Sequence, residues 1–385
     1  MNRRQFLAAG ALVAAAGCLG PDDAEPLAAV DGQGTSGRPR PDAKPDAVYM
    51  PTHREAMVHL PVAEAGPYRL SPMVAFAHEF WLVTGTETER VDANDPGLHV
   101  MVTPWDAKTG RVLPVDTGGE MRIYRDGSRI DQLAPWPMIS QTMGFHFGDN
   151  VPIQEPGTYT VEVDVNPAGV RTTGDFGGRF TESATATFEF EYDDAVREEL
   201  VEATTFVDAD RWGEHGALEP MGEPDRSDHG DGGDHNGDHG DGGEHNGDHG
   251  EHDHHEMPFS ALPRAEEYPG KDLGVHESGD ARFVVRYAEN HRLADGDGYL
   301  LVSPRTPYNR VPLADMALSV RGTVTTDLEQ TLDSEVGLHY GASADLTAGD
   351  AFDLVVETPP QVARHAGYET AFLDMPSMPV EVPDR

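Results

Sequence analysis

The sequence predicts an all-β protein with two immunoglobulin-like β-sandwich domains, joined by a disordered linker rich in His, Asp and Gly. Three observations support this. Short segments of alternating apolar and polar residues are separated by turn-forming pairs such as Asp126-Gly127 and Pro156-Gly157. Helical periodicity is scarce, and one short phrase that contains histidine occurs twice. Many short alternating strands divided by turns are typical of immunoglobulin-like sandwiches.

The N-terminal residues 1–18 have the pattern of an export signal. Arg3-Arg4 forms a twin-arginine signature, and the apolar run after it is too short to span a membrane as a helix. The run ends in small residues before Cys18, the single cysteine of the chain. We therefore expect twin-arginine export and lipidation of Cys18, with the protein anchored by lipid to the outer face of the cell membrane. A single cysteine also predicts no intramolecular disulfide.

The charge is strongly negative, with a formal net value of −40 and only three lysines. An acid-rich, lysine-poor surface is typical of proteins adapted to high salt, which screens self-repulsion. A specific acidic surface for a basic partner is the alternative. In both cases nucleic acid and anionic lipid are excluded as partners by repulsion.

The composition divides the chain into segments. Residues 19–46 predict a flexible tether, because they are rich in Pro, Asp, Gly and Ala and have no apolar periodicity. The first sandwich is expected over 47–194, and 195–221 form a connector, with a helix expected within 193–211. The tract 222–256 follows, and the second sandwich is expected over 257–385. The expected strands are 99–102, 121–124, 159–163, 186–192, 281–287, 299–302, 316–320 and 352–357.

The repeated phrase is Gly-Phe-His-Phe-Gly at 144–148 and Gly-Leu-His-Tyr-Gly at 337–341. Further matches lie upstream, at 102–104 with 302–304 and at 111–114 with 310–313. A repeat of this length predicts two copies of one domain. The histidine within each phrase, His146 and His339, is placed as a candidate site residue.

The tract at 222–256 has no apolar residue with which to build a core, so we expect it to be disordered. Neutral imidazole is a ligand for zinc, copper, nickel and iron, and the neighbouring carboxylates would concentrate cations. The tract therefore predicts weak, poorly selective binding of several ions, Zn²⁺ among them. The alternative is a linker in which histidine is incidental. The candidate ligands are His229, His235, His239, His245, His249, His252, His254 and His255.

The first domain offers a softer ligand set. Met138 and His146 combine thioether and imidazole, which suits copper, and with carboxylates suits ferrous iron. The alternative is that the methionine fills the sandwich core. His78 and Glu79 follow an apolar segment, and on a strand only one of them could face a given site. Met57 and His59 form a looser candidate pair on one strand face. An exposed histidine is the alternative at position 59.

The second domain repeats only part of this set. His339 matches His146, and His291 lies near the place that matches His78. His365 has no counterpart in the first domain, and Thr331-Leu332 stands where Met138 would be repeated. Three arrangements remain open: each domain binds metal incompletely, the two halves share sites, or one domain is structural.

These residues resemble a known family. Pro137-Met138, the phrase at 144–150 and Pro156-Gly157-Thr158-Tyr159 are similar to the periplasmic Fe²⁺-transport, copper-binding proteins. The stretch 57–61 and the residues 178–180 are similar to other parts of that family. The resemblance implies an immunoglobulin-like sandwich, often dimeric, that binds a transition metal and supports iron import beside a permease. It implies Met138 and His146 as ligands, with one further ligand from His78 or Glu79.

The chain departs from this family pattern in three places. One extra residue separates Met138 from His146, and Phe145 stands in place of the family's proline. The family's late histidine is absent from the first domain, and His365 resembles it in the second.

The expected function is an extracytoplasmic, lipid-anchored protein that binds Fe²⁺ or Cu²⁺ and passes the metal to an iron permease or another membrane metal transporter. A homodimer is expected from the resemblance. No catalytic constellation is present in the sequence, so we expect no enzymatic activity. Two alternatives remain. One is a structural or adhesive surface protein, and the other is a zinc or copper buffer that acts through the tract alone.

Overall fold

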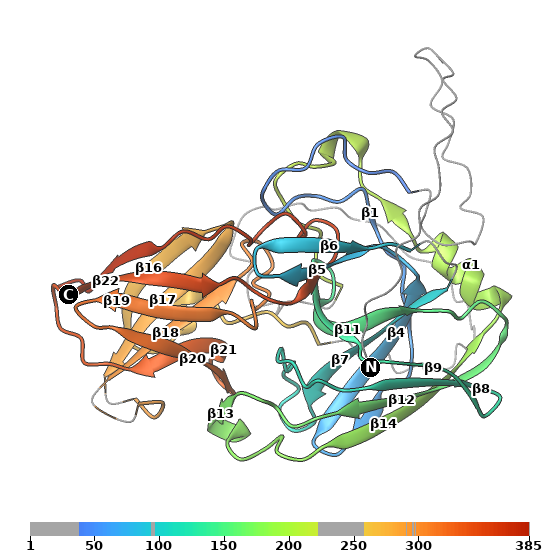
Figure 1. The fold of residues 1–385 in the computed structure, drawn as a ribbon, viewed down its shortest axis with the longest axis horizontal. Coiled ribbons are helices and arrows are strands. Elements are labelled where there is room, and N and C mark those ends of the chain that lie inside the picture. Colours follow the sequence, from blue (N-terminus) through green and yellow to red (C-terminus); the bar gives the residue numbers. More distant parts are fainter. Residues whose placement is uncertain are drawn as a thin grey trace, which may run out of the picture.

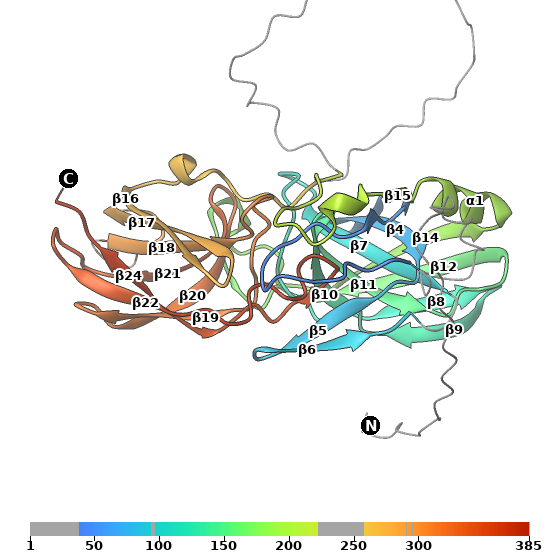
Figure 2. The ribbon, with the colours of Figure 1, turned by 90° about the horizontal axis from the view of Figure 1, so that it is seen from above.

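The computed structural model describes residues 38–93, 97–221, 258–289, 291–294, 296 and 298–384. The predicted export signal with Cys18, the beginning of the tether and the tract with its eight histidines lie outside this part. Among the described residues, no helix has the length and apolar character needed to cross a membrane. The described chain forms two β-sandwiches side by side (Figure 1 and Figure 2), as the alternating strand pattern predicts.

The first sandwich pairs a large sheet with a smaller one. The large sheet has the order β2-β4-β7-β11-β10-β23-β5-β6, with β3 beside β4, and the small sheet has the order β14-β12-β8-β9. The bounds in the large sheet are β2 (Val58–His59), β3 (Ala63–Ala65), β4 (Tyr68–Phe76), β5 (Phe80–Thr84), β6 (Glu87–Val91), β7 (Leu98–Asp106), β10 (Trp136–Ser140) and β11 (Gly144–Val151). Those in the small sheet are β8 (Met121–Arg125), β9 (Ser128–Leu133), β12 (Gly157–Val165) and β14 (Ala184–Tyr192).

The second sandwich follows the path β16-β17-β18-β21-β20-β19-β22-β24. Its strands overlap every segment that the sequence predicted for this half. Their bounds are β16 (Lys271–Ser278), β17 (Ala281–Glu289), β18 (Gly298–Arg305), β19 (Ala317–Gly322), β20 (Thr326–Asp333), β21 (Gly337–Ser343), β22 (Ala351–Thr358) and β24 (Met378–Glu381).

Two short strands cross between the sandwiches. β13 (Arg171–Thr173) belongs to the first half of the chain but pairs in parallel with β20 of the second sandwich. β23 (Ala363–Arg364) belongs to the second half, yet it pairs in parallel with β10 and antiparallel with β5 of the first. Each sandwich therefore receives one strand from the other half of the chain.

The segment between the sandwiches contains one α-helix, α1 (Asp194–Glu202), which is shorter than the region in which a helix was expected. The Asp193 side chain caps it by accepting a hydrogen bond from the backbone amide of Val196, which satisfies one of the free amides at the helix start. After the helix, β15 (Thr205–Phe206) pairs with β1 (His53–Arg54). Three single-turn 3-10 helices complete the described elements: Gly174–Phe176, Ala209–Arg211 and Ala265–Glu267.

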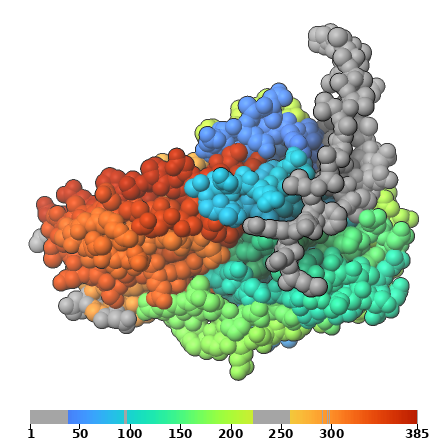
Figure 3. Space-filling model, in the orientation of Figure 1, coloured from blue at the N-terminus to red at the C-terminus, as the bar shows by residue number. Residues whose placement is uncertain are grey.

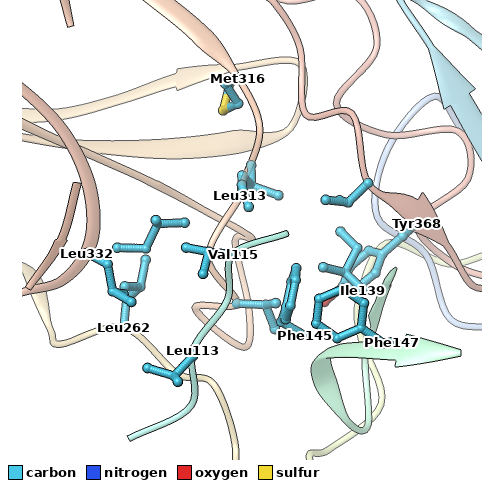
Figure 4. Close-up of a cluster of buried hydrophobic side chains, with 14 of the residues drawn as sticks. Leu113, Val115, Ile139, Phe145, Phe147, Leu262, Leu313, Met316, Leu332 and Tyr368 are labelled. Atoms are coloured by element: carbon cyan, nitrogen blue, oxygen red, sulfur yellow. The ribbon is translucent and has the colours of Figure 1, made fainter. Parts of the chain in front are cut away.

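The hydrophobic core lies on one face of the large sheet. Successive side chains of a strand point to opposite faces, so Val100 and Val102 of β7 and Phe145 and Phe147 of β11 turn towards the small sheet. The same core continues into the second half, where Leu313 belongs to one buried cluster with Phe145 and Ile139 (Figure 4). The residues that alternate with these, on the other face of the large sheet, form the site described next.

Candidate metal centre

Strand pairing gathers histidine and methionine on the outer face of the large sheet. Met138 of β10 lies opposite His146 of β11. On the other side of β11, Gly148 lies opposite Met101 of β7, and His99 precedes Met101 by two residues. These side chains share one face because they alternate with the core residues. His99, Met138 and His146 are fully buried, each with an exposed fraction of 0%.

Two loops bring further histidines to the same place. His78 follows the end of β4 and is buried. His365 directly follows β23, and its backbone amide donates a hydrogen bond of 3.1 Å to the carbonyl of Ile139 in β10. The second half of the chain thus supplies a side chain to the first sandwich. Figure 3 shows the C-terminal region in red against the blue and cyan residues of the first sandwich.

The four imidazoles of His78, His99, His146 and His365, here called the four-histidine cluster, converge: His365 is within hydrogen-bonding distance of His78 and His146, and the ring of His99 packs 4.3 Å from that of His78. The Nδ1 atom of His365 is 3.1 Å from Nε2 of His78, and its Nε2 atom is 3.1 Å from Nε2 of His146. Ligand atoms of His78, His99 and His365 all lie within 4.8 Å of one another. One ion could therefore contact several of these nitrogens after small side-chain rotations.

The hydrogen bonds around the cluster fix where the imidazole protons lie. Carbonyl oxygens only accept, so His78 Nδ1 must donate to Phe76 O at 2.9 Å and His146 Nδ1 to Gly144 O at 3.1 Å. His99 Nδ1 likewise donates to Asn150 Oδ1 at 2.8 Å. A neutral imidazole has one N–H, so the Nε2 atoms of all three histidines carry lone pairs that point into the cluster.

The cluster has fewer N–H donors than Nε2 lone pairs that need one. His365 faces the Nε2 atoms of both His78 and His146, but a neutral His365 can donate to only one of them. The Nε2 atom of His99 is buried and has no hydrogen-bond partner among the described residues. A buried acceptor without a donor costs roughly 1–3 kcal/mol. A cation that accepts these lone pairs would remove that cost.

Burial keeps the cluster neutral. Desolvation lowers the pKa of His146 to about 4, and it lowers the pKa of His78, with smaller opposing contributions from Glu55 and Phe76. Desolvation and then the neighbouring histidines hold the pKa values of His99 and His365 well below the usual range. At neutral pH all four rings are therefore uncharged, which is the form of histidine that binds metal.

The absence of a side chain at Gly148 leaves the cluster open. A Cβ atom at this position would lie 2.8 Å from Nε2 of His99, 3.1 Å from Cγ of Met101 and 3.3 Å from Sδ of Met138. The thioether of Met138 and the free nitrogen of His99 thus approach the same point. The close approach of these neighbours, and not the backbone conformation, requires glycine here. The φ angle of Gly148 is not in the left-handed region.

A cavity of about 350 Å³ opens beside the cluster and reaches His78 and His365. Glu79 also lines it and forms ion pairs with Arg40 and Arg90. The expectation that only one of His78 and Glu79 could face a given site is wrong. Residues 77–79 form a loop between β4 and β5 instead of a strand, and both residues line the cavity.

The candidate pair Met57 and His59 is separated in the structure. Met57 lines the cavity, whereas His59 is exposed at the end of β2.

The second sandwich repeats the geometry of the site without its ligands. Thr331 of β20 lies opposite His339 just as Met138 lies opposite His146. His339 Nδ1 donates to Gly337 O at 3.1 Å, the same contact that His146 makes with Gly144. Its Nε2 atom, however, accepts from the hydroxyl of Tyr299 at 3.2 Å.

By strand register, Tyr299 occupies the position in the second sandwich that His99 has in the first, and Thr173 occupies that of His365. Two further ligand positions therefore carry hydroxyl groups in the second sandwich. Thr173 donates to Asp333 at 2.6 Å. His291 follows β17 as His78 follows β4, and it is only partly buried. The structure therefore brings neither His291 nor His339 to the four-histidine cluster.

His99 was not among the candidates derived from the sequence. The signal was present, since His99 and Met101 alternate with Val100 and Val102 in a segment that was predicted as a strand. Polar or soft residues at every second position of an otherwise buried strand indicate a face that is not ordinary core.

Comparisons with known proteins match part of the chain. Residues 266–381 match a family described as Domain of unknown function (DUF7350). No curated protein matches the sequence. Among solved structures, the chain is similar to a copper-bound variant of FetP from uropathogenic Escherichia coli strain F11. That similarity has a TM-score of 0.27 and 18% identity, and it covers 35% of this chain and 97% of the other.

Proposed function

We propose that this protein binds a transition metal, copper foremost, at the four-histidine cluster, and supports metal uptake from outside the cytoplasm. The observation that carries the proposal is the mismatch between lone pairs and protons in the cluster. Three histidines spend their only N–H on carbonyl oxygens. Two of them, His78 and His146, direct Nε2 at His365, which has one proton to give. Nε2 of the third, His99, is buried without a hydrogen-bond partner among the described residues.

The ligand chemistry favours copper. Four neutral imidazoles and the thioether of Met138 are soft or intermediate donors, and such sets suit copper better than the hard cations that prefer carboxylates. Ferrous iron is the second candidate. Ferrous iron would favour a carboxylate ligand as well. Burial lowers the pKa of His78 and the charge of Glu55 partly offsets this, but the Glu55 carboxylate already pairs with His53 at 2.8 Å and with Arg38.

The cavity supports a role in transfer rather than in permanent storage. His365 is partly exposed and lines the cavity together with His78, so a bound ion would be within reach of a partner at the surface. The twin-arginine signature and Cys18 support lipid anchoring at the outer face of the membrane. The metal would then pass to a membrane permease.

The test uses a full-length variant whose eight tract histidines are replaced by serine, here called the tract-silenced chain. Its Cu²⁺ affinity is measured by competition with a chelator, beside the variants His365→Ala and His339→Ala in the same background. The proposal predicts one tight Cu²⁺ in the tract-silenced chain, lost with His365→Ala and kept with His339→Ala. A tract-silenced chain without tight copper would contradict it and leave a buffer that acts through the tract.

A further inference from the structure

A second group of soft ligands lies on the same sheet face as the four-histidine cluster. Its buried members are Met73, Met101 and Met143 with Ala75, and Met57 and Met221 pack against them. All its apolar side chains except that of the alanine are therefore methionine. The main core of the protein, by contrast, consists mostly of Val, Leu, Phe and Tyr.

The strand register brings these methionines together. Met73 of β4 and Met101 of β7 are directly opposite each other, which places their Cβ atoms roughly 4.5–5.5 Å apart. Met143 lies in the turn between β10 and β11. Its backbone amide donates a hydrogen bond of 3.0 Å to Ser140 Oγ, which holds the turn in place. Met57, Met101 and Met143 line the cavity that also reaches His78 and His365. The thioethers thus form one wall of the approach to the four-histidine cluster.

Packing alone does not account for this choice of residues. Strand positions such as 73 and 101 favour β-branched and aromatic side chains. Ordering a methionine costs roughly 1.5–2 kcal/mol of side-chain entropy, against about 0.5–1 kcal/mol for leucine or isoleucine. What methionine adds is a thioether, a soft ligand that selects Cu(I).

We propose that Met57, Met73, Met101 and Met143 form a second metal site, which binds Cu(I) through thioether sulfurs in the wall of the cavity. The inference deepens the proposed function and rests on it for its role, which is to hold the monovalent ion in the cavity wall beside the four-histidine cluster. Cu(II) prefers nitrogen and oxygen donors and would pass to the histidines instead.

The test counts Cu(I) ions bound by the tract-silenced chain under anaerobic, chloride-free conditions, with bathocuproine disulfonate as competitor. The variant is Met57→Leu, Met73→Leu, Met143→Leu, which leaves Met101 in place beside Gly148 and the histidines. It should bind one Cu(I) fewer than its parent, with unchanged Cu(II) affinity. The matched control is Met316→Leu, Met375→Leu, Met378→Leu in the second sandwich, which should bind as the parent does.

A second measurement needs no substitution. With ¹³C-labelled methionine methyl groups, Cu(I) should shift the resonances of Met57, Met73, Met101 and Met143 and leave those of Met316 and the other second-sandwich methionines in place. Equal Cu(I) counts in variant and parent, or unshifted methyl resonances, would overturn the inference. Either result is compatible with tight Cu(II) at the histidines, so the proposed function fails separately, through the His365→Ala comparison.

Discussion

The substitution Gly148→Ala tests whether the space between His99 and Met138 is where the metal sits. The new methyl carbon would lie 2.8 Å from His99 Nε2, closer than packed carbon and nitrogen atoms approach, and 3.3 Å from Met138 Sδ. A metal–nitrogen bond to histidine is about 2.0–2.1 Å long, so the methyl group and the ion would compete for the same volume. We expect the affinity for Cu²⁺ to fall at least 100-fold, the upper end of the roughly 10–100-fold loss seen when residues that support ligands are changed.

The cost to folding should be smaller than the cost to binding. Overpacking by one methyl group destabilises by about 1–3 kcal/mol, and the backbone of Gly148 needs no left-handed φ. Gly169→Ala is the control, since a Cβ atom there meets no heavy atom within 4 Å. Copper affinity is measured by chelator competition, and stability by thermal unfolding without metal. If Gly148→Ala binds copper as tightly as Gly169→Ala, the assignment of the metal position is refuted.

Three further substitutions test the surroundings of the site and the contacts between the halves. Asn150→Leu removes the acceptor that holds the His99 Nδ1 proton, so Cu²⁺ affinity should fall about 10–100-fold in the same competition assay; unchanged affinity would mean that His99 is not a ligand. Asp333→Asn removes the charge of a fully buried carboxylate that pairs with Arg292 and Thr173. The free energy of unfolding, measured in urea at neutral pH, should fall by about 3 kcal/mol. Burial alone would raise the pKa of Asp333, but Arg292 and Thr173 lower it overall, so this contribution is present above about pH 4 and is lost as the pH falls further; an equal penalty at pH 7 and pH 3 would contradict the reasoning. Asp315→Asn has the opposite sign, because burial and then Asp116 raise the pKa of Asp315 to about 6. The folded parent therefore loses stability as the pH rises from about 4 to about 6, and the variant should gain roughly 1–2 kcal/mol relative to it over that interval; parallel stability curves would rule this out.

The sequence contained enough to predict the β architecture and the histidine phrase. Residues 99–102, 121–124 and 159–163 each lie in a strand of the structure, as their pattern predicts. The last two segments alternate between buried and less buried residues, whereas 99–102 are buried on both faces of the sheet. The phrase at 144–148 begins at a glycine with φ of 70°, and its repeat begins at Gly337 with φ of 74°. A left-handed backbone conformation at the start of each strand explains why both phrases begin with glycine.

The composition of the site could be predicted only in part, because it depends on contacts between distant segments. His365 reaches His146 through β23, a two-residue strand that no periodicity could reveal. Whether the halves share a site was left open by the sequence, and the structure shows His365 of the second half beside His78 and His146 of the first. The loss of ligands in the second sandwich becomes clear only from the register, which equates Tyr299 with His99.

The central claim is that one folded site takes its ligands from both halves of the chain. Its most direct test is a crystal structure of the tract-silenced chain soaked with Cu²⁺, with anomalous diffraction measured at the copper edge. We expect a strong anomalous peak bonded to nitrogen atoms of His99, His146 and His365. A peak confined to the outer rim of the cavity, or to the second sandwich near His339, would contradict it.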